Sequence, residues 1–559
     1  MSAAREIVFH RESEMPGGPI SEAGVLYNLT GSWRYLRPRY EGKLAPCIAA
    51  CPAAERVEAW IRLLEEQEYI EAWQLIKSVN PFPRVCGRVC FHPCETECNR
   101  GQYDRSIAIH SLERFVSDHA RSLGKVQSPG IAKSGKSIGV IGSGPAGLTC
   151  AYHLARRGHS VTIYEAESEL GGLLRYGIPA YRLPKNVLNE EIDEIIELGI
   201  DVQTGRRIED VEDLRRAHDA SFIATGFGIS NELGIPGEQG EGVVDAIEFL
   251  KEVNSGHPPP VKGRVLIVGG GNAAIDAARS ASRLGAKPTI IYRRSRAEMP
   301  AHPPEVEEAE KEGIPIRYLA HPVEIIREHG DVILVECVLN RLGEPDHTGR
   351  RQPVTVAGSN FFMEADAVIV AAGEKPDPLL LGLDNILQSD EPAKVRANGL
   401  PEGVFAGGDL ASPLRSVAHA IGSGRRSAMQ IDRYLGGSGE DPADYLEVET
   451  VTFESLNVDY FPHRPRIRLP MLSLRERTEN FKEIDRGIAL KSAFEEAERC
   501  FHCGVCISCD NCYLLCPDIA VRRSADGTYS IDYDYCKGCG ICIHECPRNA
   551  MSMDEEVRK

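Results

Sequence analysis

The chain has 559 residues, of which 42% are hydrophobic and 26% charged, as in a globular protein of about three to four domains. Its 82 acidic residues outnumber its 64 basic ones, and the net charge of -18 disfavours nucleic acid and acidic membrane surfaces as partners. No apolar run reaches the roughly 18 to 20 residues that span a bilayer, and the N-terminus "MSAAREIVFHRESEMPGG" lacks the apolar segment of a signal peptide, so we expect a cytoplasmic protein.

The 18 cysteines indicate metal binding. All but two fall in two groups, one between residues 47 and 98 and the other between residues 500 and 546. The two exceptions, Cys150 and Cys337, stand in apolar segments and are expected to be core residues.

The first cysteine group predicts an α-helical iron–sulfur domain over residues 1–130. Apolar residues recur at a helical period between Trp60 and Ile76, so two short helices are expected to bring its cysteines together. We expect one or two 4Fe-4S clusters, with one favoured because six thiols cannot supply two cubes with four each, and a structural zinc site is the alternative. The cysteines are Cys47, Cys51, Cys86, Cys90, Cys94 and Cys98.

The segment "KSIGVIGSGPAGLTCAYHLARRGHSVTIYEAES" has the pattern of a dinucleotide-binding βαβ unit. A strand over residues 138–141 leads into Gly142, Gly144 and Gly147, and a second strand ends at Glu165. The glycines let the backbone approach a pyrophosphate at the helix N-terminus, and the acid accepts a hydrogen bond from a ribose hydroxyl. This unit suits the adenosine half of FAD.

A second unit, "GRVLIVGGGNAAIDAARSASRLGAKPTIIYRRS", has Gly269, Gly271 and Ala274 at the glycine positions. Arg293 stands where the first unit has its acid, and Arg294 follows it. A cation at this position suits a 2'-phosphate, so the unit is expected to bind NADP(H) in preference to NAD(H). The alternative is that both arginines belong to a solvated edge.

A later stretch, "GVFAGGDLASPLRSVAHAIGSGRRSA", places Gly408 and Asp409 at a strand end beside a helix start, where Asp409 can lie near the flavin. We therefore expect two Rossmann-like domains in an α/β arrangement. The FAD domain would comprise residues 131–242 and 374–440, and the NAD(P)H domain residues 243–373.

The second cysteine group contains two runs of the form C-x2-C-x2-C-x3-C-P, which is typical of ferredoxins with two 4Fe-4S clusters. In such a run the fourth cysteine ligates the other cube, whereas two zinc ribbons would leave it unexplained. Residues 495–559 are therefore expected to form an α+β ferredoxin-like domain, after a linker over residues 441–494. One predicted ligand set is Cys506, Cys509, Cys512 and Cys546, and the other is Cys536, Cys539, Cys542 and Cys516. The spacing assigns no role to Cys500 and Cys503, which precede the first run.

From the first cysteine group to about residue 440, the chain resembles the small subunit of glutamate synthase and its relatives, among them the N-terminal half of dihydropyrimidine dehydrogenase and the large subunit of NADH-dependent ferredoxin:NADP oxidoreductase. The matching words include "NPFPRVCGRVCFHPCETEC", "IGSGPAGL", "GGLLRYGIPAYRLPK", "VGGGNAAIDAAR", "YRRSRAEMPA" and "VIVAAGEKPD". The resemblance implies that Glu113 ligates a cluster and that the cofactors also contact Pro145, Ala146, Gly172, Leu173, Asn272 and Gly373. Relatives with two N-terminal clusters have two more cysteines before the position of Cys47; this chain has none there, which argues against a complete second cluster.

The last segment, "YSIDYDYCKGCGICIHECPRNAMSM", resembles the small ferredoxin-like subunit of 2-oxoacid:ferredoxin oxidoreductases. Only a flavin exchanges electrons readily with both a nicotinamide and a cluster, so we expect an NAD(P)H-dependent flavin iron–sulfur oxidoreductase that needs no catalytic acid or base. Its partner would be a ferredoxin or a redox complex, with a 2-oxoacid oxidoreductase as the first choice. The alternatives are the electron-input subunit of a glutamate synthase-like enzyme and a non-catalytic redox sensor or scaffold.

Overall fold

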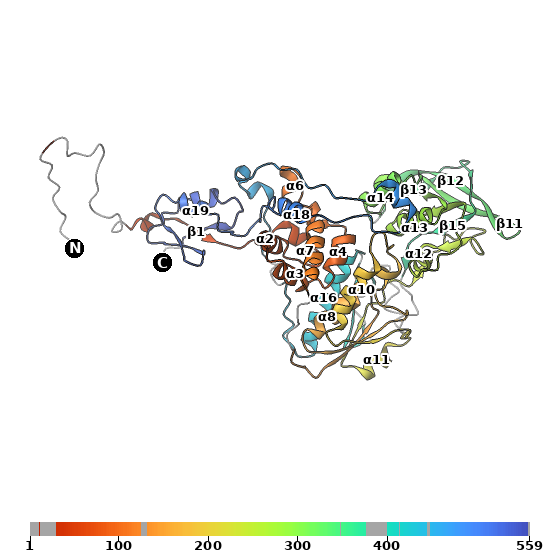
Figure 1. Ribbon diagram of the computed structural model, residues 1–559, viewed down its shortest axis with the longest axis horizontal. Helices are drawn as coiled ribbons and strands as arrows, with labels where there is room; N and C mark the ends of the chain where they lie inside the picture. The colour runs from red at the N-terminus through yellow and green to blue at the C-terminus, as the bar shows by residue number, and fades with distance from the viewer. Residues whose placement is uncertain are drawn as a thin grey trace.

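The computed structural model describes residue 11 and residues 29–124, 131–346, 348–375, 400–412, 414–443 and 448–556. The N-terminal stretch "MSAAREIVFHRESEMPGG", in which no signal peptide is expected, lies outside these residues, apart from Arg11. The molecule is elongated, with the C-terminal cysteine runs at one end, a group of helices in the middle and two sheet-containing parts beyond them (Figure 1). Among the described helices, none has both the length and the hydropathy required to cross a bilayer.

A helical module lies at the centre of the molecule (Figure 1). The two helices expected within the first cysteine group are confirmed as α2 and α3, and they bury Trp60, Leu64 and Ile76 completely. The helices of this module are α1 (Pro46–Ala50), α2 (Val57–Glu65), α3 (Tyr69–Lys77), α4 (Pro83–Val89), α5 (Pro93–Thr96), α6 (Arg100–Tyr103) and α7 (Ile109–Leu123).

The first sheet is five-stranded and parallel, in the order β17-β5-β2-β3-β4. Strand β2 is a nearly continuous apolar run, as expected where helices cover both faces of a parallel sheet. The strands are β2 (Ser137–Ile141), β3 (Ser160–Tyr164), β4 (Asp201–Gln203), β5 (Ala220–Ile223) and β17 (Val404–Ala406). The accompanying helices are α8 (Pro145–Ala155), α9 (Leu173–Tyr176), α10 (Lys185–Ile196), α11 (Val211–Ala217) and α16 (Val417–Tyr434).

The second sheet is also five-stranded and parallel, in the order β10-β9-β8-β15-β7. Its strands are β7 (Val243–Asp245), β8 (Arg264–Val268), β9 (Lys287–Tyr292), β10 (Ile316–Tyr318) and β15 (Ala367–Val370), with helices α12 (Ala246–Asn254), α13 (Asn272–Arg283) and α14 (Pro303–Lys311). An antiparallel sheet covers its other face, formed by β11 (Ala320–Glu328), β12 (Asp331–Pro345), β13 (Arg351–Thr355) and β14 (Phe361–Glu364). The chain passes between the two parallel sheets through the short pair β6 (Ile229–Ser230) and β16 (Glu374–Lys375).

The two lone cysteines lie in these cores, as predicted. Cys150 is fully buried in α8 and Cys337 is fully buried in β12.

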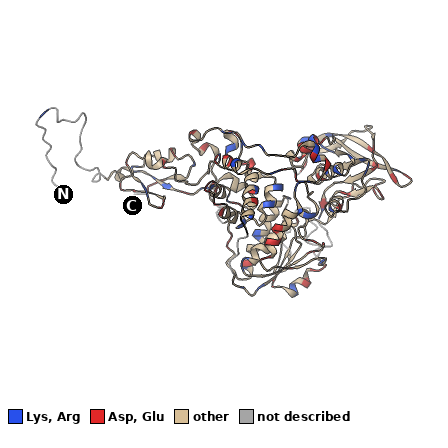
Figure 2. Ribbon diagram, viewed as in Figure 1, with Lys and Arg blue, Asp and Glu red and all other residues tan. Residues whose placement is uncertain are grey.

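A strap over residues 448–489 follows the first sheet and includes α17 (Leu474–Glu479). It contacts the second-sheet module through Arg477, which pairs with Glu308, and the helical module through Glu483, which pairs with Arg88 at 2.8 Å. The next helix, α18 (Leu490–Ala497), buries Ala493 and Ala497 in the same core as α2 and α7. Figure 2 shows basic and acidic segments interspersed over the central helices.

The ferredoxin-like module contains α19 (Asn511–Leu514), β18 (Val521–Arg523), β19 (Tyr529–Ile531), α20 (Ile541–His544) and β20 (Met551–Glu555). Strand β1 (Leu36–Tyr40) pairs antiparallel with β20, and Arg34 donates to the Cys536 carbonyl oxygen at 2.9 Å. This differs from the expected division, which assigned all of residues 1–130 to the helical domain. The reason is that β20 offers an unpaired edge, which β1 covers.

Candidate functional site

The glycines of the first dinucleotide unit lie between β2 and α8, as predicted. Gly142 has a φ of +94°, and a Cβ added at Gly147 would lie 2.0 Å from the Gly142 carbonyl oxygen, so both positions require glycine. In contrast, a Cβ at Gly144 would meet no atom within 4 Å. Gly144 is the N-cap of α8 and Pro145 its first residue, so open space faces backbone N–H groups that suit an anion.

Glu165 follows β3 and turns its carboxylate toward this loop. Its Oε2 accepts from the Ser143 backbone N–H at 2.8 Å and from the Ser143 hydroxyl, while Oε1 accepts from the Glu167 N–H at 2.9 Å. Each carboxylate oxygen can accept a further bond. Glu165 is therefore held beside the loop, at the place expected for a partner of a ribose hydroxyl.

Two other segments approach the start of α8. A Cβ at Gly172 would lie 2.9 Å from Gly144 Cα, and a Cβ at Gly408 would lie 2.9 Å from Ala146 Cβ. Leu173 begins α9 beside Gly172 and is partly exposed. Asp409 follows Gly408, and burial raises the pKa of its carboxyl. The structure thus brings the predicted residues of both halves of the FAD domain together.

The second unit has the same construction between β8 and α13. A Cβ at Gly269 would lie 2.3 Å from the Ala371 carbonyl oxygen, whereas a Cβ at Gly271, the N-cap of α13, would meet nothing within 4 Å. Asn272 starts the helix and accepts from the His302 N–H at 2.9 Å, and Ala274 is fully buried. Gly373 lies apart from this loop, where the chain crosses back to the first sheet, with a φ of +93°.

The two predicted arginines have different surroundings. Arg294 is buried and donates to Asp346 at 2.7 Å and to the Arg351 carbonyl oxygen at 2.8 Å. The Arg293 side chain is exposed and has no ion-pair or hydrogen-bond partner among the described residues. Burial of part of the side chain and the neighbouring charge of Arg294 lower its pKa. Arg293 is therefore the cation that is available to an added anion.

The ferredoxin-like module contains two cavities, each lined by cysteines of both runs. The first is lined by Cys516 from one run together with three cysteines of the other run: Cys536, Cys539 and Cys542. The second is lined by Cys546 together with Cys506, Cys509 and Cys512. Pro38 and Tyr40 of β1 complete the walls. The grouping is the crossed one that the motif predicts.

The helical module divides its thiols into two groups. The first, called the inner thiol group, lies beside the core of the first sheet and consists of Cys51, Cys86, Cys90 and Cys94. Glu113 lies next to it and shares the Asn80 amide, which donates at 3.3 Å, with Glu55. Burial and the nearby Glu55 carboxylate raise the pKa of Glu113.

The second group, called the outer thiol group, contains two cysteines that sequence reasoning left without a role. It consists of Cys47, Cys98, Cys500 and Cys503, which share one hydrophobic core. A signal was present in the sequence, because the word "CFH" occurs at both Cys90 and Cys500.

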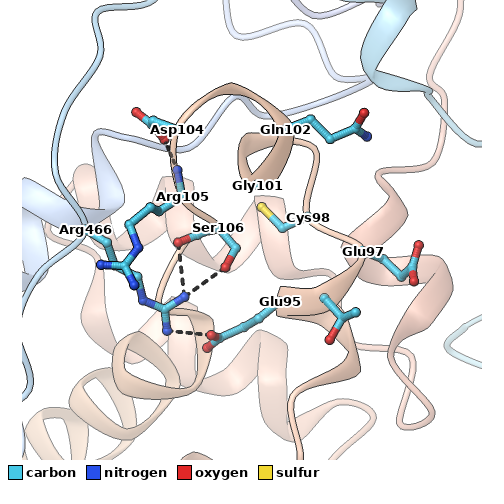
Figure 3. A pocket seen from close by; sticks show the side chains of 10 residues that line it. Glu95, Glu97, Cys98, Gly101, Gln102, Asp104, Arg105, Ser106 and Arg466 are labelled. Carbon is cyan, nitrogen blue, oxygen red and sulfur yellow. Dashed lines mark hydrogen bonds and ion pairs between the residues drawn. The ribbon is translucent and has the colours of Figure 1, made fainter.

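An open cavity of about 520 Å³ lies beside Cys98 (Figure 3). Its floor comes from α5, α6 and the segment that leads to α7, and the strap residue Arg466 forms one wall. Arg466 donates to Ser106 Oγ at 2.9 Å and to Glu95 at 2.5 Å. The strap therefore borders a cavity that one cysteine of the outer thiol group, Cys98, helps to line.

Three family models match the chain in consecutive regions. Residues 136–424 match pyridine nucleotide-disulphide oxidoreductases, residues 40–125 match the 4Fe-4S cluster domain II of dihydropyrimidine dehydrogenase, and residues 529–552 match a 4Fe-4S binding domain. The first match contains both dinucleotide loops, and the others contain cysteines of both groups.

Three curated relatives are similar over most of their length. The beta subunit of NADP(+)-dependent formate dehydrogenase from Moorella thermoacetica is 39% identical, over 82% of this chain and 70% of the relative. The beta subunit of NADPH-Fe(3+) oxidoreductase from Geobacter sulfurreducens is 38% identical, over 82% and 75%. The small chain of NADPH glutamate synthase from Escherichia coli is 33% identical, over 70% and 88%. With the two loops and the cysteine groups, these matches show that the chain belongs to the pyridine nucleotide-disulphide oxidoreductase family, as an FAD-containing iron–sulfur enzyme related to the glutamate synthase small subunit.

Proposed function

We infer that the chain transfers electrons between NADP(H) and a redox partner through FAD and 4Fe-4S clusters. The observation that carries this inference is the shared core of the inner thiol group and the first sheet. Cys86 lies in that core with Val140 and Phe222, and a Cβ at Gly422 of α16 would lie 2.0 Å from the Pro52 carbonyl oxygen, next to Cys51. A cube in the inner thiol group would therefore lie directly beside the flavin domain.

The residues of the first sheet fit FAD. The open space at Gly144 and the uncapped start of α8 suit the pyrophosphate, and Glu165 suits the adenosine ribose. When bound, a flavin supplies two-electron exchange with a nicotinamide and one-electron exchange with a cluster. The chain's own residues hold and orient the cofactors, so no acid–base side chain is assigned.

The second sheet fits NADP(H) better than NAD(H). Arg293 is an exposed cation at the end of β9, and Arg350 lies near enough to lower its pKa further. Asp346 is paired with the neighbouring Arg294, so the Arg293 guanidinium stays available to a bound phosphate. The relatives from Moorella and Geobacter carry NADP(+) and NADPH in their names, which supports the same choice.

The ferredoxin-like module suits two cubes, one in each cavity with crossed ligation. The inner thiol group and Glu113 together offer five groups, of which four would hold a third cube. These thiols need a reducing compartment, so the cytoplasm remains the proposed location.

For the partner we propose a dehydrogenase subunit or a ferredoxin. Two of the relatives named above are beta subunits, which supports a multi-subunit assembly. A 2-oxoacid oxidoreductase remains the proposal drawn from the ferredoxin-like segment. The glutamate synthase alternative is less favoured, because its match covers 70% of the chain against 82% for the formate dehydrogenase subunit.

Anaerobic titration with NADPH and NADH tests the proposal. NADPH is expected to bleach the flavin and then reduce the clusters, and failure of both nucleotides to bleach it would leave only a sensor or scaffold. Arg293→Glu should raise KM for NADPH about tenfold or more, as loss of a charge-assisted hydrogen bond implies, with little change for NADH. Arg296→Ala is the matched control, because the exposed Arg296 is already paired with Glu310 at 2.5 Å. An unchanged nucleotide preference in Arg293→Glu would refute the NADP(H) assignment.

A further inference from the structure

We propose that the outer thiol group, Cys47, Cys98, Cys500 and Cys503, holds a fourth 4Fe-4S cluster, which the chain completes with two cysteines from beyond the strap. Cys500 and Cys503 lie outside the regions matched by the three family models. This site supplies the two thiols that the segment before Cys47 lacks.

The four thiols lie in one hydrophobic core. All four side chains pack in the core that contains Trp60 and Phe501, and Cys503 is one of its buried members. Four sulfur donors in one core, one of them buried and three partly buried, are the donor set that a cube needs.

The loop that carries Cys500 is built like loops of the predicted ligands. The His502 N–H donates to Cys500 Sγ at 3.4 Å, and the His92 N–H donates to Cys90 Sγ at 3.4 Å, with φ values of +48° and +53° at the two histidines. In the ferredoxin-like module, backbone N–H groups likewise donate to Cys516 and Cys546. The core cysteine Cys337 instead acts as a donor to a carbonyl oxygen. Cys500 is therefore placed as a sulfur acceptor, which is what a ligating thiolate is.

The loop is fixed in place by buried polar contacts. Arg499 is 1% exposed and donates to Asp104 at 2.9 Å, and His502 is bonded to the Glu58 carbonyl oxygen at 3.2 Å. Asn99, beside Cys98, donates its amide to Cys503 Sγ at 3.6 Å. These contacts attach the loop to α2 and α6, so the meeting of the two chain segments is specified by packing.

The spacing of the sulfurs favours a cube over a single zinc ion. A tetrahedral zinc would hold its sulfurs about 3.8 Å apart, given Zn–S bonds of about 2.3 Å. Among the described residues, no three thiols lie within 4.8 Å of one another. In a 4Fe-4S cube each thiolate binds a different iron atom, so the four sulfurs lie farther apart than they would around one zinc ion.

The position of the outer thiol group indicates which electron transfers a cluster there would serve. On one side, Cys94 of the inner thiol group packs in the same core as the outer thiol group. On the other side, the Gly504 N–H, next to Cys503, donates to the Arg548 carbonyl oxygen at 2.7 Å, and Arg548 follows the cavity cysteine Cys546 by two residues. A cube here joins the inner group to the ferredoxin-like module, and each transfer moves one electron with no bond made or broken.

Metal content of the full chain, purified anaerobically with its cofactors, tests the proposal. Four cubes give about sixteen irons per chain, and three give about twelve. About sixteen irons without zinc is the expected result. About twelve irons, with or without one zinc ion, would overturn the proposal.

Substitution then identifies the ligands. Cys500→Ala with Cys503→Ala should lose about four irons while FAD content stays unchanged. The matched control is Cys150→Ala with Cys337→Ala, which removes two buried thiols outside the group and should keep all of the iron. Retention of about sixteen irons in the first variant would refute the proposal.

A single Cys503→Ser variant covers the case in which the double variant fails to fold. The serine oxygen can stay on the iron, so one signal in the electron paramagnetic resonance spectrum of the reduced protein should shift. An unchanged spectrum would count against ligation. Only the electron-transfer role of the cube rests on the proposed function. The two proposals can fail separately, because a protein that lacks this cube can still oxidise NADPH.

Discussion

The two iron–sulfur regions of the chain are assembled in opposite ways. In the ferredoxin-like module, both cavities take their cysteines from one stretch of sequence, between residues 506 and 546. In the helical module, the outer thiol group joins cysteines from near both ends of the chain, and α18 and Arg499 hold the distant segment in place. Spacing alone can predict the first kind of site, whereas the second depends on tertiary packing.

The largest expected effect concerns the crossed arrangement in the ferredoxin-like module. Cys546→Ala with Cys506→Ala removes two residues of one cavity and should cost about four irons. Cys546→Ala with Cys536→Ala removes residues of both cavities and should cost about eight. Iron analysis distinguishes the two variants. If each run held its own cube, the first variant would lose about eight irons and the second about four. The crossed grouping would then be wrong.

The second-largest effect is expected at Arg499, which fixes the segment that carries Cys500. Arg499→Ala leaves Glu496, which is fully buried, without its cation, so the free energy of unfolding should fall by about 3–5 kcal/mol. Arg475→Ala breaks the exposed pair with Glu479 and should cost less than about 1 kcal/mol. Anaerobic urea titration measures both. Equal losses of stability would show that the buried pair of Arg499 and Glu496 does not hold the outer thiol group together.

The junction between the helical module and the flavin domain should depend on pH. Glu191 of α10 accepts from the Arg84 and Val85 N–H groups at the start of α4, and burial raises its pKa from 4.5 to about 7. The unfolded chain ionises first, so the contribution of Glu191 to stability is fully present below pH 4.5 and is lost as the pH rises to about 7, by on the order of 1–3 kcal/mol. Glu191→Gln should flatten this slope, and the exposed Asp193→Asn should not. A slope of opposite sign would mean that the two N–H groups outweigh burial.

The smallest effect tests how far the ferredoxin-like module relies on the N-terminal strand. The Tyr40 hydroxyl lies 3.2 Å from Cys512 Sγ, and burial raises its pKa, which keeps the proton available for donation. Tyr40→Phe should lower the potential of that cluster by about 20–60 mV, as loss of one hydrogen bond to sulfur implies. Tyr529→Phe is the control, because Tyr529 donates to Asp510 and not to sulfur. Redox titration measures the cluster potentials. Equal potentials in Tyr40→Phe and the unchanged protein would mean that β1 covers the module without influencing the cluster.

Much of the dinucleotide architecture could be predicted from the sequence, because it is local. The two strands around Gly142 end within about one residue of the predicted positions, and Glu165 lies where its spacing indicated. The crossed cysteine grouping was also predictable, since the motif contains it.

What could not be predicted depends on contacts between distant segments. The different roles of Arg293 and Arg294 follow from Asp346, which comes directly after β12, and no local pattern connects this residue with the arginines. The pairing of β1 with β20 and the approach of Cys500 to Cys47 likewise require the folded chain. The repeated "CFH" word was visible, but three residues are too few to indicate a shared role.

The distance along the chain between Cys47 and Cys500 also has a consequence for biosynthesis. Chains are made from the N-terminus and fold domain by domain, so α1 to α7 can form while the ribosome is still adding the two sheets. The outer thiol group stays open until α18 and the loop after it have been made. Loading of that site is therefore one of the last steps of maturation, and a chain interrupted in the strap would carry FAD with a half-formed outer thiol group.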